Sequence, residues 1–156
     1  MKCAVVAIVV AIILVSTIVT PVISAGDLTR QEPIEVEVQL GTKEGEHKFE
    51  PSELTFETGK LYKLVLTNSS STKHYFSSPK FASKVYTRKV RVLNNGNRMA
   101  EIKGNIREVE VFPGGTAEWW FVPVSTGVLT DLHCGVKDKD GRTHAEHGMV
   151  GTIVIE

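Results

Sequence analysis

The chain has 156 residues, with 18 Lys and Arg against 18 Asp and Glu, so its formal net charge is zero. This length is that of one domain of ordinary size. The balanced charge lacks the basic excess that is typical of nucleic-acid-binding proteins, so we expect no nucleic-acid partner. A hydrophobic fraction of 42% argues against a disordered body, because a sizeable core can form.

The first 25 residues, MKCAVVAIVVAIILVSTIVTPVISA, differ in composition from the rest of the chain. A lysine at position 2 precedes a long apolar run, which indicates a secretory signal peptide with cleavage after Ala25. A second interpretation stays open, because residues 4–23 are about long enough to span a bilayer as an uncleaved membrane anchor. Both interpretations place the body in the periplasm or another extracytoplasmic compartment.

The export prediction changes the meaning of the cysteines. Cys3 belongs to the leader, so the body keeps Cys134 as its single cysteine. Exported domains commonly use cysteines in disulfide pairs. A single one indicates an intermolecular disulfide, a reactive thiol or a metal thiolate.

Residues 26–33 are polar and are expected to form a linker before a domain at 34–156. Within the domain, short segments of strand-like pattern are separated by turn signals such as NNGN at 94–97 and PGG at 113–115. The expected strands are 34–40, 54–57, 61–68, 85–93, 106–112, 116–124, 128–134 and a last strand within 149–156. One helical turn is expected within 77–85. About eight short strands without a long helical pattern predict an all-β Greek-key sandwich or barrel.

Four residues that can bind metals have a specific distribution along these strands. Cys134 ends a predicted strand, His144 and Met149 lie in the loop before the last strand, and His74 follows the strand at 61–68. In a Greek-key sandwich the two loops can meet at one end. A thiolate, two imidazoles and a weak thioether are the ligands of blue-copper sites. The soft sulfur stabilises Cu(I), the imidazoles suit both oxidation states, and the methionine tunes the potential.

Two other kinds of site use cysteine and histidine. Structural zinc sites favour four strong ligands, often with CxxC or HxxxH spacing, and this chain has no CxxC and offers a thioether instead. A catalytic cysteine would need an activated thiol, but Cys134 follows a strand rather than beginning a helix, and no oxyanion-hole signature is visible. Ligand type therefore favours copper.

The closing segment resembles that of the cupredoxins. Plastocyanin-like domains end in Cys, a variable spacer, His-x4-Met and a last strand, and here Cys134 is followed by His144, AEHG, Met149 and VGTIVI. The nine-residue spacer is similar in length to that of the type 1 domain of copper nitrite reductases. The phrases HAEHGM, PGGTAEWWFVP and NSSSTKHYFSS more closely resemble exported cupredoxins found with copper-tolerance functions. The resemblance covers residues 34–156.

This resemblance implies one type 1 copper ion bound by His74, Cys134, His144 and Met149. It implies electron transfer with a redox partner protein, with periplasmic copper sequestration or delivery, alongside other copper-handling proteins, as the alternative. We expect a monomer and no enzyme activity, because related oxidases and nitrite reductases need a second copper centre. Electrons are expected to pass through the exposed edge of His144. Tyr75 stands where many plastocyanin-like proteins have Asn, which leaves the surroundings of the ligands open.

The remaining candidates are assigned other places. His133 precedes Cys134 on the same strand and should point to the opposite face, away from the metal. His47 is expected at the surface or an edge, and His147, which fits no spacing known for this site, at its rim. Met99 is expected to pack or to lie in a mobile loop. Of the adjacent Trp119 and Trp120, one ring should face the core and the other the opposite side.

Overall fold

The computed structural model describes residues 26–156. The predicted signal peptide or anchor at 1–25 lies outside the described residues. No helix within residues 26–156 is long and apolar enough to cross a membrane. The expected linker contains a short 3-10 helix, η1 (Leu28–Arg30), whose preceding residue Asp27 accepts a hydrogen bond from the Thr29 N–H.

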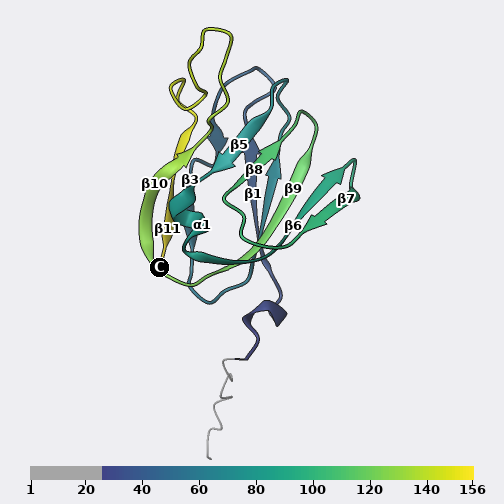
Figure 1. The fold of residues 1–156 in the computed structure, drawn as a ribbon, viewed down its shortest axis with the longest axis vertical. Helices are drawn as coiled ribbons and strands as arrows, with labels where there is room; N and C mark the ends of the chain where they lie inside the picture. Colours follow the sequence, from purple (N-terminus) through teal and green to yellow (C-terminus); the bar gives the residue numbers. More distant parts are fainter. Residues whose placement is uncertain (1–25) are drawn as a thin grey trace, which may run out of the picture.

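Two mixed sheets make up the domain (Figure 1). The six-stranded sheet has the order β2 (Phe49–Glu50), β1 (Ile34–Leu40), β4 (Tyr62–Thr67), β9 (Thr116–Pro123), β6 (Val85–Asn94) and β7 (Asn97–Ile102). The five-stranded sheet has the order β3 (Glu53–Phe56), β11 (Val150–Ile155), β10 (Gly127–His133), β5 (His74–Ser77) and β8 (Glu108–Val111). The pairs β1–β4 and β3–β11 are parallel. The prediction of an all-β sandwich is confirmed.

Each of the eight expected strands is present, and three further strands were not expected. β2 has two residues and β5 has four, which is too short for a clear alternating pattern. β7 is exposed at all of its residues, so the sequence NRMAEI carries no buried face to reveal it. The expected helical turn is α1 (Pro79–Ala82), which begins after Ser78 and buries Phe81.

The core forms where alternate side chains of the two sheets meet. Tyr62, Leu64 and Leu66 of β4 are buried in turn, and so are Ala117, Trp119 and Phe121 of β9. Aromatic rings pack edge to face in this core, among them Phe56, Phe81, Trp119 and Phe121. Such contacts contribute beyond the area they bury. The strands therefore hold one continuous apolar layer between the sheets.

The two tryptophans divide between the faces of β9, as predicted. Trp119 is 1% exposed and its indole N–H donates to Thr87 Oγ1 at 3.0 Å. Trp120 lies on the other face, where the Lys89 ammonium stands 4.5 Å from its ring centroid.

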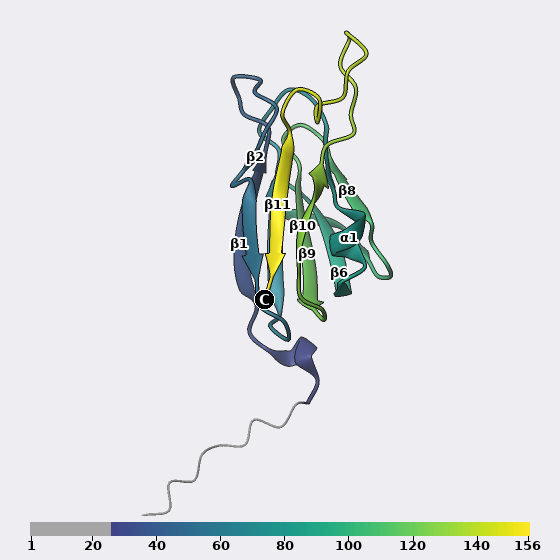
Figure 2. The ribbon, with the colours of Figure 1, turned by 90° about the vertical axis from the view of Figure 1, so that its left-hand side faces the viewer.

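The pairing of β5 with β10 determines where the loops meet. His133, the last residue of β10, is paired with Ser77 of β5, so Cys134 emerges beside that strand. The loop from Cys134 to Met149 then extends beyond the sheets before the chain returns as β11 (Figure 1). Both views show η1 and the C-terminus at the opposite end (Figure 2).

Substitution of the two tryptophans tests this division. We expect Trp119→Ala to lower the free energy of unfolding by about 3–5 kcal/mol, because it leaves a cavity in the core and frees the Thr87 hydroxyl. Trp120→Ala should cost clearly less, since only a partly buried ring and its contacts with cations are lost. Denaturant unfolding of the metal-free proteins measures both, and equal losses would contradict the assignment of faces.

Candidate metal centre

Three of the four predicted ligands bring their donor atoms together in the structure. The Nδ1 atoms of His74 and His144 are 3.0 Å apart. Cys134 Sγ lies 3.8 Å from Nδ1 of His74 and 3.5 Å from Nδ1 of His144. The three side chains come from positions 74, 134 and 144, so the fold assembles them from two distant segments.

These spacings are close to those of donors around a single ion. A metal at about 2.0–2.1 Å from nitrogen and about 2.3 Å from sulfur holds such atoms roughly 3.3–3.8 Å apart. The two sulfur–nitrogen distances agree with this range, and the nitrogen–nitrogen distance is slightly shorter. Cys134, His74 and His144 are at most 1% exposed. The donor set therefore fits a metal that is shielded from water.

Met149, the fourth predicted ligand, is fully buried beside the other residues. Its backbone N–H donates to the His144 carbonyl at 2.8 Å, and its carbonyl accepts from the Cys134 N–H at 3.2 Å. The Ala145 N–H also donates to the Cys134 carbonyl at 3.0 Å. These three backbone bonds fix the spacing of the loop from Cys134 to Met149.

The thiol of Cys134 lies in an environment suited to a thiolate ligand. The backbone N–H of Tyr75 donates to its sulfur at 3.3 Å. Burial raises the pKa of the Cys134 thiol above its ordinary value, although backbone N–H groups oppose the shift. The metal-free thiol is therefore protonated near neutral pH, and metal binding must release that proton. Tyr75, which replaces the usual Asn, contacts the site through its main chain.

His74 is held from behind by a buried polar network. Its Nε2 lies 2.9 Å from the Ser70 hydroxyl. Asn68, which is fully buried, accepts from the Ser70 N–H and hydroxyl and donates to the carbonyls of Thr72 and Val111. Asn68 thus braces the segment that precedes β5. Sequence reasoning missed this role, since the only available signal was the asparagine at the start of NSSST.

The expectation that the edge of His144 is exposed is wrong. His144 is 0% exposed, and the imidazole of His47 stacks on it with ring centroids 3.9 Å apart and an interplanar angle of 20°. His47, expected at the surface or an edge, is instead half-buried, with 18% of its side chain exposed. It is brought there by the turn before β2, a long way from the closing loop in sequence.

His47 extends the cluster of imidazoles. Nitrogen atoms of His47, His74 and His144 all lie within 4.8 Å of one another, a spacing at which three donors can hold a metal. The near-parallel stacking of His47 on His144 argues against shared coordination, because ring lone pairs lie in the ring plane and parallel planes do not converge on one ion. We therefore treat His47 as a neighbour of the ligand set.

The charged spacer at 137–142 forms a small hairpin that covers the site. Lys137 and Thr143 make a bridge, and the Gly141 N–H donates to the Asp138 carbonyl at 3.0 Å. Asp138 Oδ2 bonds to Nε2 of His47 at 2.9 Å. Burial alone would raise the pKa of Asp138. The nearby imidazoles of His47 and His144 outweigh this effect and hold that pKa below its ordinary value. This carboxylate is charged at neutral pH.

The other candidates lie apart from the three donors. His147 stands at the rim, as expected, with its Nε2 3.2 Å from Asp140 Oδ2. The ring of His133 bonds to the carbonyl of Asp131 at 2.8 Å. Met99 is 65% exposed on β7. None of these three belongs to the group of close donors found among residues 26–156.

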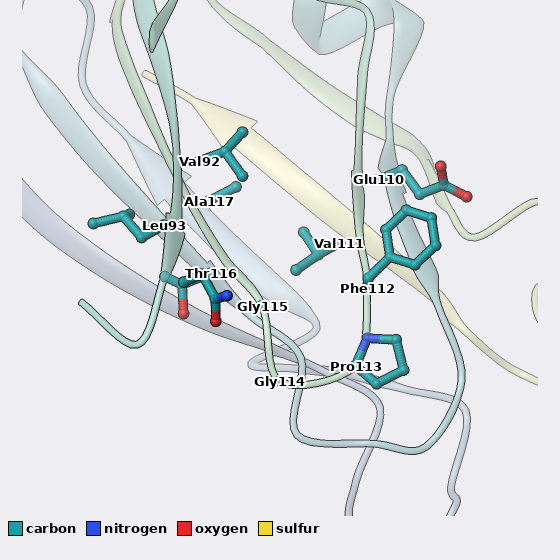
Figure 3. Close-up of a pocket in the computed structure, with 11 residues that line it drawn as sticks. Val92, Leu93, Glu110, Val111, Phe112, Pro113, Gly114, Gly115, Thr116 and Ala117 are labelled. Carbon is teal, nitrogen blue, oxygen red and sulfur yellow. The ribbon is translucent and has the colours of Figure 1, made fainter. Parts of the chain in front are cut away.

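A separate cavity of about 260 Å³ opens between the end of β6 and the turn from β8 to β9 (Figure 3). Residues 92–94 and 110–117 line it. Val111 and Ala117 face its interior, whereas Phe112 turns outward and is 60% exposed. Its lining has no histidine, cysteine or methionine, so this cavity offers no soft metal ligand.

Solved structures share this arrangement of strands. The McoA multicopper oxidase of the hyperthermophile Aquifex aeolicus matches 81% of this chain with a TM-score of 0.54 and 11% identity. The multicopper oxidase of Campylobacter jejuni matches 80% of it with a TM-score of 0.50 and 18% identity. The chain has the cupredoxin fold. It spans 30% of the length of each of these oxidases.

No protein-family model matches the chain, and no curated protein matches its sequence. Auracyanin from the photosynthetic bacterium Roseiflexus castenholzii matches 81% of this chain and 99% of its own, with a TM-score of 0.47 and 16% identity. At 18% and 11% identity, the likeness to the two oxidases shows the fold alone and leaves function to be argued from the site.

The burial of His74 predicts how the metal-free protein responds to acid. Burial, with smaller effects of His144 and His47, lowers the pKa of His74 from 6.5 to about 4. As the pH falls from 6.5 to 4, His74 binds a proton in the unfolded chain but stays neutral in the folded state. The free energy of unfolding should therefore fall by up to about 3 kcal/mol. Denaturant unfolding across this range measures the slope, and His74→Asn should make it shallower. An unchanged slope in that variant would contradict the assignment.

A glycine pair tests whether His74 needs the space behind it. Gly41 has φ +65°, and a Cβ there would lie 2.4 Å from His74 Nε2, whereas Gly45 has φ +90° and open space around it. Both alanine variants strain the backbone, but only Gly41→Ala also displaces the imidazole. We expect Gly41→Ala to weaken copper binding about 10–100-fold in competition with a chelator. Equal losses in Gly45→Ala would attribute the effect to strain alone.

Proposed function

We propose that this chain is an exported type 1 copper protein that carries single electrons. The observation that supports this most is the convergence of Cys134 Sγ with the Nδ1 atoms of His74 and His144, at separations of 3.0–3.8 Å. Cys134, His74 and His144, with the Met149 thioether as a weak further ligand, would hold one copper ion there. Copper would supply one-electron exchange between Cu(II) and Cu(I).

The chemistry of the donors favours copper over zinc. Met149 supplies a thioether, which suits soft Cu(I) and is a poor ligand for zinc. Burial of all four side chains leaves no open position for water, which a catalytic metal would need. The residues of the chain hold the donors in place and exclude solvent, so a change of oxidation state would need little rearrangement.

The place and partners of the protein are part of the same proposal. The apolar leader supports a periplasmic or extracytoplasmic site of action, reached by cleavage after Ala25 or with residues 4–23 kept as a membrane anchor. The partner would be a redox protein that exchanges electrons with a monomer of this chain. We propose no enzyme activity, because the burial of the candidate ligands leaves no open position at which a substrate could reach the metal.

Copper sequestration or delivery is a second candidate, favoured by the covered edge of His144. His47 stacks on His144, and Asp138 faces its Nε2 atom. His147 lies next to Asp138 and, further out, to Asp140. Such residues could pass copper toward the buried thiolate. Deletion of the gene separates the two candidates, since copper sensitivity with normal respiration supports handling and loss of a redox pathway supports electron transfer.

Visible absorption tests the copper assignment. The Cu(II) protein should show an intense band from charge transfer between the Cys134 thiolate and copper, and Cys134→Ser should abolish it. His144→Ala should also lose the native spectrum, whereas His147→Ala should retain it, because only the former removes a nitrogen from the group of close donors. The assignment fails if the wild-type protein lacks the band or if the two histidine variants behave in the opposite way.

A further inference from the structure

The carboxylate of Asp138 faces three imidazoles at the outer edge of the candidate site. Its Oδ2 lies 2.9 Å from Nε2 of His47 and 3.6 Å from Nε2 of His147, and its Oδ1 lies 3.4 Å from Nε2 of His144. The last distance is at the long end for a hydrogen bond. Within residues 26–156, Nε2 of His144 has no other hydrogen-bond partner although it is buried. A small inward movement of Asp138 would satisfy that nitrogen.

This arrangement selects one tautomer of the ligand histidine. An ionised carboxylate can only accept hydrogen bonds, so Asp138 favours a proton on the nitrogen that faces it. In His144 that nitrogen is Nε2, which leaves the lone pair on Nδ1, the atom 3.0 Å from His74 Nδ1 and 3.5 Å from Cys134 Sγ. A partner of this kind behind a histidine ligand also orients its ring and raises its basicity.

His47 completes the support. It bonds to the other oxygen of the same carboxylate and stacks on the His144 ring at 3.9 Å. Movement of His144 out of its plane would therefore break the stack and separate the ring from Asp138. The imidazole and the carboxylate together hold the ligand from its face and from its outer edge.

We propose that Asp138, supported by His47, is a positioning residue that sets the tautomer and orientation of His144 and lowers the reduction potential of the copper site. This inference rests on the proposed copper-binding function. The charge of the carboxylate favours the more highly charged Cu(II) over Cu(I), since Coulomb attraction grows with the charge of the ion. Neutralising Asp138 should therefore weaken Cu(II) binding more than Cu(I) binding.

The first experiment needs no metal. Nitrogen-15 NMR of the metal-free wild-type protein should show His144 with its proton on Nε2, and Asp138→Asn should shift part of the population to the Nδ1–H form. A wild-type His144 that carries its proton on Nδ1 overturns the proposal without any variant, so the test does not depend on the folding of a mutant.

The second experiment measures the reduction potential by titration of the copper protein. We expect Asp138→Asn to lower the ratio of Cu(II) to Cu(I) affinity about tenfold, which raises the potential by about 59 mV for a one-electron couple. Asp140→Asn is the matched control, because this carboxylate lies in the same hairpin but faces His147 and Arg142. The reduction potential of the Asp140→Asn variant should stay close to that of the wild type. An equal rise in both variants would indicate a general effect of charge and overturn the positioning role.

A substitution of His47 tests whether this residue supports Asp138. His47→Phe keeps an aromatic ring on His144 but removes the bond to Asp138, so the potential should move in the same direction as in Asp138→Asn, by less. An unchanged or lowered potential in Asp138→Asn, or a raised one without a change of tautomer, overturns the proposal. The proposed function stands or falls separately, since it requires the thiolate-to-copper band of the wild-type protein, which none of these variants removes.

Discussion

The loops at one end of the domain are arranged around the burial of two imidazoles and a thiol, which are at most 1% exposed. Burying polar groups is unfavourable unless they are paired. These three contact one another, the Ser70 hydroxyl and the Tyr75 N–H. The fold offsets this by fixing the backbone on every side: β5 is paired with β8 and β10, and the closing loop is bonded to itself from Cys134 to Met149. The apolar layer between the sheets supplies the stability on which such a site draws.

Much of the architecture follows from the sequence because the central strands are half-buried. The alternation in LYKLVLTN and TAEWWFVPV reports directly which side chains meet the core, and the same pattern separates Trp119 from Trp120. β7 shows the limit of this reasoning. All of its residues are exposed, so its only local sign was the tight turn at 94–97, and its place as an edge strand depends on pairing with β6.

The candidate site also combines residues that the sequence identifies with residues that only the structure reveals. Ligand chemistry and the spacing of the last loop pointed to Cys134, His144 and Met149, and the resemblance added His74. His47 could not be found this way, because it lies 97 residues before His144 and reaches it only through the packing of the turn before β2. Asn68 lies only six residues before His74, but its bond to the Val111 carbonyl depends on the pairing of β5 with β8. Residues that support a site from distant segments leave no periodic or spaced pattern in the chain.

The end of the domain that carries η1 and the C-terminus lies opposite the loop from Cys134 to Met149 (Figures 1 and 2). Any tether joined to the chain ahead of η1 would therefore attach at the end of the domain opposite the candidate metal site, which would face away from the tether. The domain could then move through the volume that the tether allows, and its candidate metal site could meet partners on several sides. The tether and any partner at the candidate site would contact opposite ends of one small β-sandwich, so neither would obstruct the other.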